Sequence, residues 1–276
     1  MVSIIIPNYN HDIYLTQRIE CVLNQTYTNF EVIILDDCST DNSRDIIEQY
    51  RNHTKVTKIV CNETNSGSTF KQWQKGIELA QGEWIWIAES DDYCEFNFLE
   101  VCIKKLLQNP NAALVYSKSI RVDESGKYLD DLSNWYNDLS NHKWISDYSN
   151  HGIEEIKSSL VYKNTIPNAS AVVFRREHIK NYWSEILDFK LCGDWLFWIN
   201  LLETGDVVYT VETQNYFRTH TKSVRSNTTS TILDFERKKI LKYLRVARIL
   251  NQIDFIRLTT KNRFLIKITH WLDIII

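Results

Sequence analysis

Residues 83 to 92 read EWIWIAESDD. The apolar run at the start of this stretch is typical of a strand that is buried on both faces. It ends in Glu89, Ser90, Asp91 and Asp92, with no basic residue nearby in the sequence. Carboxylates this close repel one another unless a cation or water lies between them. The cluster is therefore either a solvated turn or a site for a divalent metal ion.

The segments around this stretch alternate between strand and helix patterns. We expect helices at 13–25, 39–51 and 68–81, buried strands at 2–7, 30–37 and 83–92, and a further strand at 56–62. Alternating strands and helices with continuously apolar strands predict an α/β fold. Its sheet should be Rossmann-like, mostly parallel and flanked by helices.

Polar residues follow each predicted strand. In sheets of this kind the ligand lies beyond the carboxyl ends of the strands. Because these ends meet at one edge of the sheet, we expect their polar residues to share one site. Its members are Asn8, Asn10, Asp36, Asp37, Asn65, Gly67, Glu89, Ser90, Asp91 and Asp92.

The first turn, PNYNHD at 7–12, contains no glycine. A nicotinamide dinucleotide site needs a glycine-rich turn here, so this class is disfavoured. Asp36 and Asp37 can accept hydrogen bonds from a ribose or a base, while a diphosphate needs a cation. The carboxylates that end the fourth strand suit Mg²⁺ or Mn²⁺. The sequence therefore predicts a nucleotide diphosphate bridged by a metal ion.

Charge is distributed unevenly along the chain. The net charge of −3 and the pI near 6.2 give no signal for nucleic acid. Residues 231–276 carry ten Lys/Arg and four Asp/Glu, so this tail is +6 and the remainder is −9. Its apolar residues recur at helical spacing, which predicts a basic amphipathic helical extension. Such an extension can lie on an anionic membrane surface, or pack its apolar face on the domain or on another subunit.

The six cysteines form no C-x-x-C pair and no metal-ligand spacing, which suits reduced, buried thiols in the cytoplasm. No stretch approaches the roughly 20 apolar residues that span a bilayer. We therefore expect a cytoplasmic protein, with peripheral contact to the inner face of the membrane if the tail binds lipid.

Four motifs in order resemble the family 2 glycosyltransferases of the bacterial surface-polysaccharide type. They are VSIIIPNYN (2–10), EVIILDDCSTDNS (31–43), NSGSTFKQWQKGIELAQGEWIWIAESDD (65–92) and CGDWLFWINL (192–201). The resemblance covers residues 1 to about 220. It implies an inverting enzyme with the GT-A fold over 1–230, with a nucleotide-binding half at about 1–115 and an acceptor-side half at about 116–230. The extension at 231–276 follows.

The resemblance implies roles on the donor side. Pro7, Tyr9, Asp36 and Asp37 match positions that line the base and ribose of a UDP, dTDP or GDP sugar. Lys71 falls near a position that is commonly basic in the family and faces the nucleotide.

The resemblance also implies a metal site. Asp91 matches the last acid of the family's D-x-D motif, and Glu89 stands where its first Asp is usual. The stretch YFRTHTKSVRS (216–226) looks like the family's C-terminal loop. There His220 could complete the metal or diphosphate site, and Arg218 or Lys222 could cover the phosphates.

On the acceptor side, Asp194 matches the Asp of the family's Glu-Asp motif, with Gly193 in place of the Glu. The resemblance implies that Asp194 is the general base for a saccharide or lipid-linked saccharide acceptor. Trp195 and Asn168 are candidates for contact with the acceptor. The aromatic-rich segment 121–165 is expected to be a loop-rich insertion, in which Trp135, Tyr136 and Trp144 either stack on sugars or anchor the loop.

Two alternatives remain. A sugar-phosphate nucleotidyltransferase would need a basic, glycine-rich loop near the N-terminus, and residues 7–12 do not provide one. A non-catalytic nucleotide- or sugar-binding module would not need a base, and the presence of Asp194 argues against it.

Overall fold

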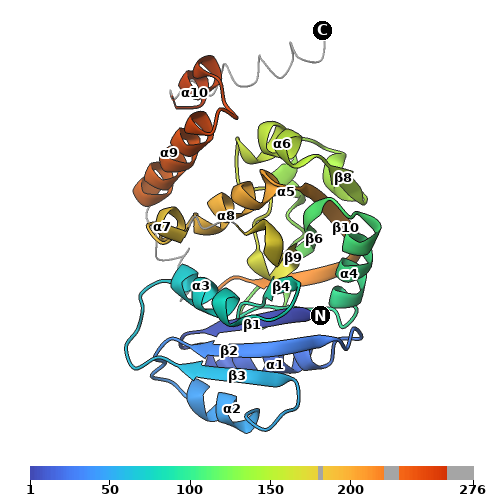
Figure 1. Cartoon of the computed structure of the whole chain (residues 1–276), viewed down its shortest axis with the longest axis vertical. Helices are drawn as coiled ribbons and strands as arrows, with labels where there is room; N and C mark the ends of the chain where they lie inside the picture. Colours follow the sequence, from blue (N-terminus) through green and yellow to red (C-terminus); the bar gives the residue numbers. More distant parts are fainter. Residues whose placement is uncertain (180–182, 221–229, 260–276) are drawn as a thin grey trace.

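The computed structural model describes residues 1–179, 183–220 and 230–259. Its N-terminal part alternates strands and helices as expected (Figure 1). Strand β1 pairs in parallel with β2 and β4, and β2 pairs in parallel with β3. The elements are β1 (Val2–Asn8), α1 (Asp12–Leu23), β2 (Phe30–Asp36), α2 (Ser43–Gln49), β3 (Val56–Cys61), α3 (Thr69–Leu79) and β4 (Trp84–Ile87).

The second part extends the same sheet. Strand β9 (Val172–Arg175) lies antiparallel between β4 and β6 (Ala112–Val122). Strand β6 pairs in parallel with β10 (Asp206–Arg218), which pairs antiparallel with the short β5 (Tyr93–Cys94). The main sheet therefore has the order β3-β2-β1-β4-β9-β6-β10-β5.

Strand β1 shows how one sheet builds two cores. Its successive side chains point to opposite faces. Ile4 and Ile6 pack with α1, α2 and α4 (Phe98–Gln108), whereas Ile5 packs with α3 and α8 (Gly193–Leu202). Burying a side chain of this size stabilises the fold by about 1.5–3 kcal/mol. Burial on both faces accounts for the absence of polar residues from the middle of β1 and β4.

The segment 121–165 contains more regular structure than expected. It forms β7 (Tyr128–Asp130), α5 (Ser133–Tyr136), η1 (Lys143–Ile145), β8 (Tyr148–Asn150), α6 (Gly152–Glu155) and η2 (Ile156–Leu160). Tyr136 and Trp144 are buried and stacked with ring centroids 4.3 Å apart. The indole of Trp135 donates to the carbonyl of Asn164 at 2.9 Å. These aromatic residues anchor the segment, so the structure favours anchoring over sugar stacking. Short elements η3 (Ala169–Ala171), η4 (Arg176–His178) and α7 (Trp183–Ile186) follow.

The C-terminal helix α9 (Ser230–Val246) lies beside α7 and α8 in Figure 1, and α10 (Gln252–Thr259) follows at the far end of α9. Ile240, Leu241 and Leu244 of α9 join the core that contains α8. Glu236 is buried, and its carboxylate accepts hydrogen bonds from the backbone N–H groups of 190, 191 and 192 at 2.7, 3.1 and 2.8 Å. The apolar face of α9 therefore packs on the domain. Residues 260–276 of the predicted extension lie outside the described residues.

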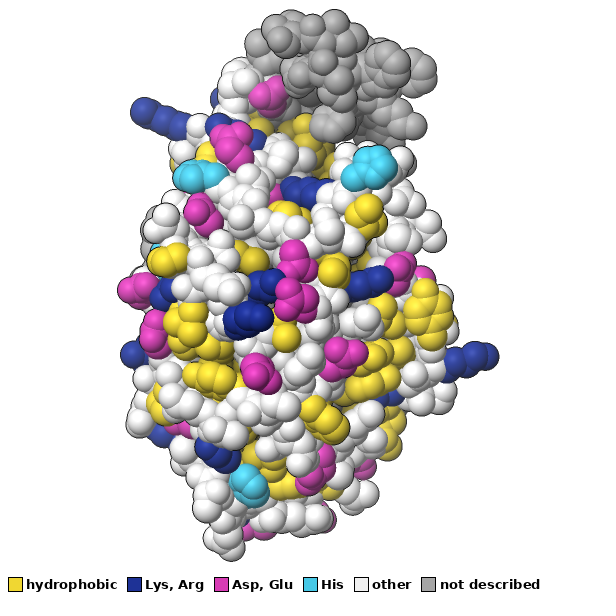
Figure 2. Space-filling view, turned by 90° about the vertical axis from the view of Figure 1, so that its right-hand side faces the viewer, with side chains coloured by type: hydrophobic (Ala, Val, Ile, Leu, Met, Phe, Trp, Pro, Cys, Tyr) yellow, Lys and Arg dark blue, Asp and Glu magenta, His cyan; other side chains and the backbone are white. Residues whose placement is uncertain are grey.

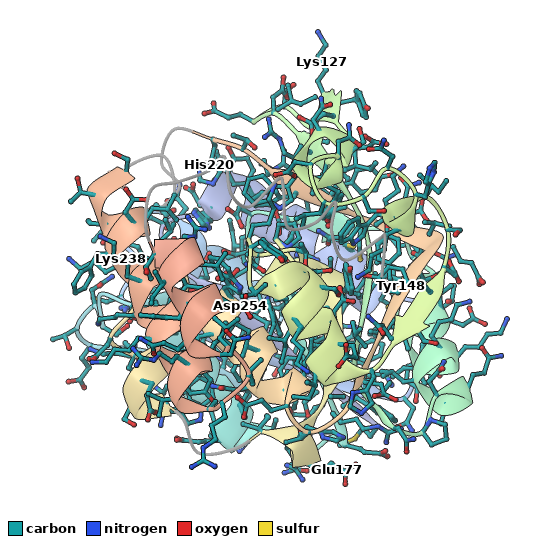
Figure 3. All side chains as sticks on the ribbon, turned by 90° about the horizontal axis from the view of Figure 1, so that it is seen from above. Lys127, Tyr148, Glu177, His220, Lys238 and Asp254 are labelled. Atoms are coloured by element: carbon teal, nitrogen blue, oxygen red, sulfur yellow. The ribbon has the colours of Figure 1, made fainter. Side chains whose placement is uncertain are left out.

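The surface carries mixed charge. On the face shown in Figure 2, acidic and basic side chains are interspersed. Lys238, Lys242 and Arg245 lie on the exposed side of α9, and Figure 3 shows Lys238 at the outer edge of the molecule. Within the described residues, every helix is too short or too polar to cross a membrane.

Candidate nucleotide and metal site

Hydrogen bonds join the carboxyl ends of the first three strands. Asn8 at the end of β1 donates to Asp36 at the end of β2, with 3.0 Å between Nδ2 and Oδ1. Asp37 accepts from Nδ2 of Asn62, which follows β3, at 2.6 Å and from Oγ of Ser66 at 2.7 Å. The predicted meeting of these polar ends is therefore present.

Asp36 and Asp37 are both buried. Oδ2 of Asp36 accepts from the backbone N–H of Ser39 and from Nε of Arg44, both at 3.0 Å. Gln72 also donates to Asp37, at 2.9 Å. Both carboxylates thus hold the loops in place, and their contact with a base or ribose stays a prediction. The other predicted donor residues differ in exposure: Pro7 is buried in β1, Tyr9 is 46% exposed, and Lys71 donates to the carbonyl of Ser66 at 3.0 Å.

Three residues beside these strand ends have left-handed backbone conformations. Asn10 has φ 55°, Cys38 has φ 64° and Gly67 has φ 71°. The side chain of Asn10 accepts from the backbone N–H of Thr40 at 2.8 Å, which ties the first turn to the second. Only glycine, and less often asparagine, adopts this conformation at low cost. The strain at Cys38 lies next to the predicted nucleotide-binding Asp37.

Three side chains gather where β4 ends. Nε2 of His220 lies 2.9 Å from Oδ2 of Asp91, and Nδ1 of His11 lies 2.8 Å from Oγ of Ser90. One ligand atom from each of His11, Asp91 and His220 lies within 4.8 Å of the others. The three residues come from the start of α1, the turn after β4 and the end of β10. We call these three residues the metal cluster, because their ligand atoms are close enough to hold one ion.

Sequence reasoning missed His11. Its side chain joins the metal cluster only because α1 starts beside the turn after β4. One signal was available in the sequence. Histidine is a common metal ligand, and His11 directly follows Asn10 in a turn already assigned to the site.

Glu89 and Asp92, which were predicted as metal ligands, lie outside the metal cluster. Oε1 of Glu89 accepts from the indole of Trp73 at 2.7 Å, and Oδ1 of Asp92 accepts from the backbone N–H of Arg218 at 2.9 Å. Both carboxyl groups are turned to protein donors, whereas Asp91 and His220 lie together with His11. Which of these residues bind a metal ion stays a prediction.

Burial and charge set the protonation of this turn. Burial raises the pKa of Glu89 to about 8 and that of Asp92 to about 7, and in both cases the charge of Asp91 acts in the same direction. Burial also acts to raise the pKa of Asp91, but the hydrogen bond with His220 and the nearby His11 hold this pKa below its usual value. Asp91 is therefore the carboxylate that stays ionised and can bind a cation.

Asp194 lies in the first turn of α8. Its Oδ1 accepts from the backbone N–H of Trp195 at 2.7 Å, and its Oδ2 accepts from Nδ2 of Asn164 at 3.0 Å. A Cβ at the preceding Gly193 would lie 2.6 Å from the ring of Phe70. This close approach explains why the chain has glycine where the family resemblance leads us to expect Glu. The role of Asp194 as a base stays a prediction.

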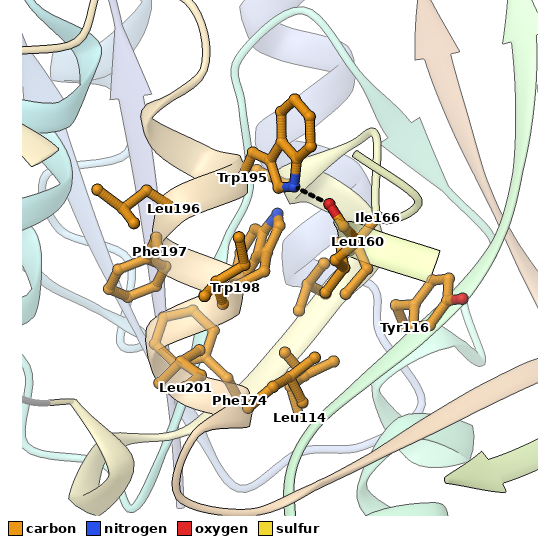
Figure 4. Packing of buried hydrophobic residues seen from close by; sticks show 14 of the residues in the cluster. Leu114, Tyr116, Leu160, Ile166, Phe174, Trp195, Leu196, Phe197, Trp198 and Leu201 are labelled. Carbon is orange, nitrogen blue, oxygen red and sulfur yellow. Dashed lines mark hydrogen bonds between the residues drawn. The ribbon is translucent and has the colours of Figure 1, made fainter. Parts of the chain in front are cut away.

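Trp195 and Asn168, both predicted to touch the acceptor, are buried. The indole of Trp195 donates to the carbonyl of Leu160 at 2.9 Å, within the hydrophobic core that Figure 4 shows. Oδ1 of Asn168 accepts from the backbone N–H of Ser170 at 2.8 Å and caps η3. Both side chains are held by hydrogen bonds within the protein, and their contact with an acceptor stays a prediction.

Arg218, predicted to cover the phosphates, is buried and bound within the protein. It donates to the carbonyl of Asp91 at 2.8 Å, to the carbonyl of Glu124 at 2.8 Å and to Oε1 of Gln17 at 2.7 Å. It supports the turn instead of projecting towards a ligand. Lys222 lies outside the described residues.

Comparison with known proteins adds to this geometry. The model described as "Glycosyl transferase family 2" matches residues 3–183. Glycosyltransferase TuaG of Bacillus subtilis (strain 168) is 28% identical over 228 residues, which are 82% of each chain. Glycosyltransferase GlyG of Streptococcus pneumoniae is 34% identical over 125 residues, 45% of this chain and 41% of GlyG.

Solved structures agree on the fold. The crystal structure of S. aureus TarS 1-349 in complex with UDP-GlcNAc matches with a TM-score of 0.70 and 20% identity, over 94% of this chain and 70% of that one. At this identity the match supports the GT-A fold alone. Asp194 and His220 lie beyond the residues that the family model matches.

Proposed function

The chain belongs to glycosyl transferase family 2, and we propose that this glycosyltransferase moves a sugar with inversion from a nucleotide-diphosphate sugar to a saccharide or lipid-linked saccharide. The observation that carries the proposal is the metal cluster His11, Asp91 and His220 beside the joined ends of β1, β2 and β3. Relatives named glycosyltransferases favour transfer over a nucleotidyltransferase or a binding module.

The donor that we propose is a UDP sugar first, with dTDP and GDP sugars as the other candidates. Structures of S. aureus TarS hold UDP-GlcNAc and UDP. In this chain Asp36, Asp37 and the exposed Tyr9 stand at the strand ends where a base and ribose would bind. TuaG is named for teichuronic acid biosynthesis, and this supports assembly of a bacterial surface polysaccharide as the process.

The residues fit a divalent ion. Asp91, which stays ionised, and the two imidazoles of His11 and His220 would hold it. Because Mg²⁺ favours oxygen ligands, the two nitrogen donors favour Mn²⁺ over Mg²⁺. When bound, such an ion neutralises the charge that grows on the departing diphosphate.

We propose that Asp194 takes the proton of the acceptor hydroxyl as that oxygen attacks the anomeric carbon from the side opposite the diphosphate. Hydrogen bonds from Asn164 and from the N–H of Trp195 fix the carboxylate. General-base assistance of this kind contributes about 10²–10⁴ in rate.

We also propose that the exposed side of α9 contacts the membrane that carries a lipid-linked acceptor. Lys238, Lys242 and Arg245 follow one another at helical spacing on that side, and Phe235 and Val246 beside them are 60% and 74% exposed. Cations interleaved with apolar residues suit an anionic lipid surface. This proposal would place the protein in the cytoplasm, at the inner face of the membrane.

Thermal melting with UDP, GDP, dTDP and CMP, each with Mn²⁺ or with a chelator, tests the donor site. A ligand at about 100 times its Kd adds roughly 2.7 kcal/mol, which raises Tm by several degrees in a chain of this size. A shift with one nucleotide that requires Mn²⁺ is the expected result. Equal shifts with and without the chelator would remove the metal from the proposal, and no shift with any nucleotide would contradict the donor site.

A further inference from the structure

Arg18 lies in α1 and contacts the acidic turn 89–92 through the carbonyl of Glu89. We propose that Arg18 is a positioning residue for the metal cluster: its guanidinium fixes the backbone of this turn while leaving the carboxylate of Asp91 available to a cation. This inference rests on the metal site of the proposed function.

The burial of Arg18 is costly and is only partly compensated. Its side chain is 0% exposed. Nε donates to the carbonyl of Glu89 at 2.8 Å, while Nη1 and Nη2 find no hydrogen-bond acceptor among the described residues. Taking a charge out of water costs several kcal/mol, and a well-packed apolar side chain at such a site is often neutral or stabilising. The stability of the fold alone therefore does not account for an arginine here.

One face of α1 carries side chains that contact the metal cluster or the acidic turn. His11 precedes the helix and belongs to the metal cluster, and the ring of Tyr14 lies 5.4 Å from that of His220. Arg18 follows at i+7 from His11, so the three side chains share one face. Arg18 thus links the position of α1 to the position of the turn.

Arg218, at the end of β10, supports the same turn. Each arginine donates through Nε to a backbone carbonyl, Arg18 to Glu89 and Arg218 to Asp91, both at 2.8 Å. In the part of the chain that the structure describes, neither guanidinium forms an ion pair within 4.0 Å with a carboxylate of the turn; Asp91 pairs with His220. An arginine paired directly with Asp91 would compete with the metal ion. Binding to the carbonyls avoids this competition.

The test compares Mn²⁺ affinity, measured by electron paramagnetic resonance of free Mn²⁺, with the Tm of the metal-free protein. Arg18→Met removes the hydrogen bond and the charge at similar volume. Loss of a positive charge by itself would strengthen the binding of a cation. A fall in affinity at unchanged Tm therefore reports the loss of positioning and not the loss of charge.

We expect Arg18→Met to weaken Mn²⁺ binding about tenfold or more, as loss of groups that orient metal ligands typically does, without lowering Tm. Arg18→Lys keeps the charge but not the planar donor, and should weaken binding less than Arg18→Met does. If Arg18→Met does not fold, Arg18→Lys is measured in its place. The proposal is overturned if the folded variant binds Mn²⁺ with the same affinity as wild type.

Arg175 provides a matched control. Its Nε donates to the carbonyl of Ala112 at 3.1 Å and its guanidinium lies over Trp84, at the other end of β4. Arg175→Met should leave Mn²⁺ affinity unchanged, and an equal fall there would also overturn the role of Arg18. Asp91→Asn separates the two proposals. If it binds Mn²⁺ like wild type, the metal site itself is wrong; if it loses Mn²⁺ while Arg18→Met keeps it, only the inference about Arg18 fails.

Discussion

Nε2 of His220 lies 2.9 Å from Oδ2 of Asp91, although the residues are 129 positions apart in the chain. Strand β10 ends at Arg218, beside the turn that follows β4, and the backbone N–H of Arg218 binds Asp92. The end of β10 therefore closes the acidic turn and completes the metal cluster.

Asp91→Asn should abolish the Mn²⁺-dependent stabilisation by UDP, because it removes the ionised ligand of the cluster. His11→Ala and His220→Ala should each weaken it about tenfold or more. The measurement is Tm against Mn²⁺ concentration at fixed UDP. His53→Ala, at an exposed histidine outside the cluster, is the control and should behave like wild type.

The metal-free protein should lose stability as the pH rises. The pKa of Glu89 is 4.5 in its ordinary state and about 8 in the fold. Between these values the folded chain holds a proton that the unfolded chain has released, so rising pH favours unfolding until the folded pKa is passed. Asp92, with its pKa raised to about 7, acts in the same direction.

Glu89→Gln checks this cause, because the amide imitates the protonated acid. Urea unfolding in chelator should show a shallower loss of stability from about pH 5 to about pH 8 in the variant than in wild type. An equal slope in both proteins would assign the pH dependence to other groups.

Asp194→Asn should keep donor binding and lower transfer by about 10²–10⁴, because the amide cannot accept the proton of the acceptor. The rate of sugar transfer to the acceptor measures the effect on catalysis, and the Kd for UDP measures donor binding. Asn164→Ala should cause a smaller loss, since it removes only one hydrogen bond that orients Asp194. Unchanged transfer in Asp194→Asn would exclude this residue as the base.

Cys38→Gly should stabilise the protein by about 1 kcal/mol, because Cys38 has φ 64° and a Cβ is unfavourable in that conformation. Urea unfolding gives the free energy. Cys38→Ala keeps the Cβ and serves as the control; a gain of the same size in Cys38→Ala would show that the sulfur, and not the backbone, is responsible.

The exposed side of α9 should bind vesicles that contain anionic lipid. Each cation near such a surface contributes about 1 kcal/mol, so replacing Lys238, Lys242 and Arg245 together by Ala should cost roughly 3 kcal/mol of binding. Co-sedimentation with vesicles measures this loss. A second triple variant at the exposed Lys104, Lys127 and Lys157 is the control. Equal binding by wild type and the α9 variant would contradict membrane contact through this helix.

Periodicity predicted the first half of the fold because β1, β2 and β4 are buried on both faces and read as apolar runs, and because the helices follow local patterns. The edge strand β3 is only partly buried. The same logic predicted the joining of Asn8, Asp36 and Asp37 at the strand ends. Burial direction was not predictable in α8, which is apolar on nearly every face, so Trp195 gave no sign that it points into the core. His11 was missed for a related reason: its role depends on the packing of α1 against a turn about 80 residues away, which no local pattern records.

Glu236 has a consequence for the order in which the protein can be completed. The N–H groups of residues 190–192, which lead into α8 and Asp194, find their acceptor 44 to 46 residues later in the chain. During synthesis from the N-terminus, the backbone N–H groups of residues 190–192 lack this hydrogen-bond acceptor until α9 has been made. Truncation before Glu236 would leave the same three groups without this acceptor, so we expect it to loosen the segment that leads into α8.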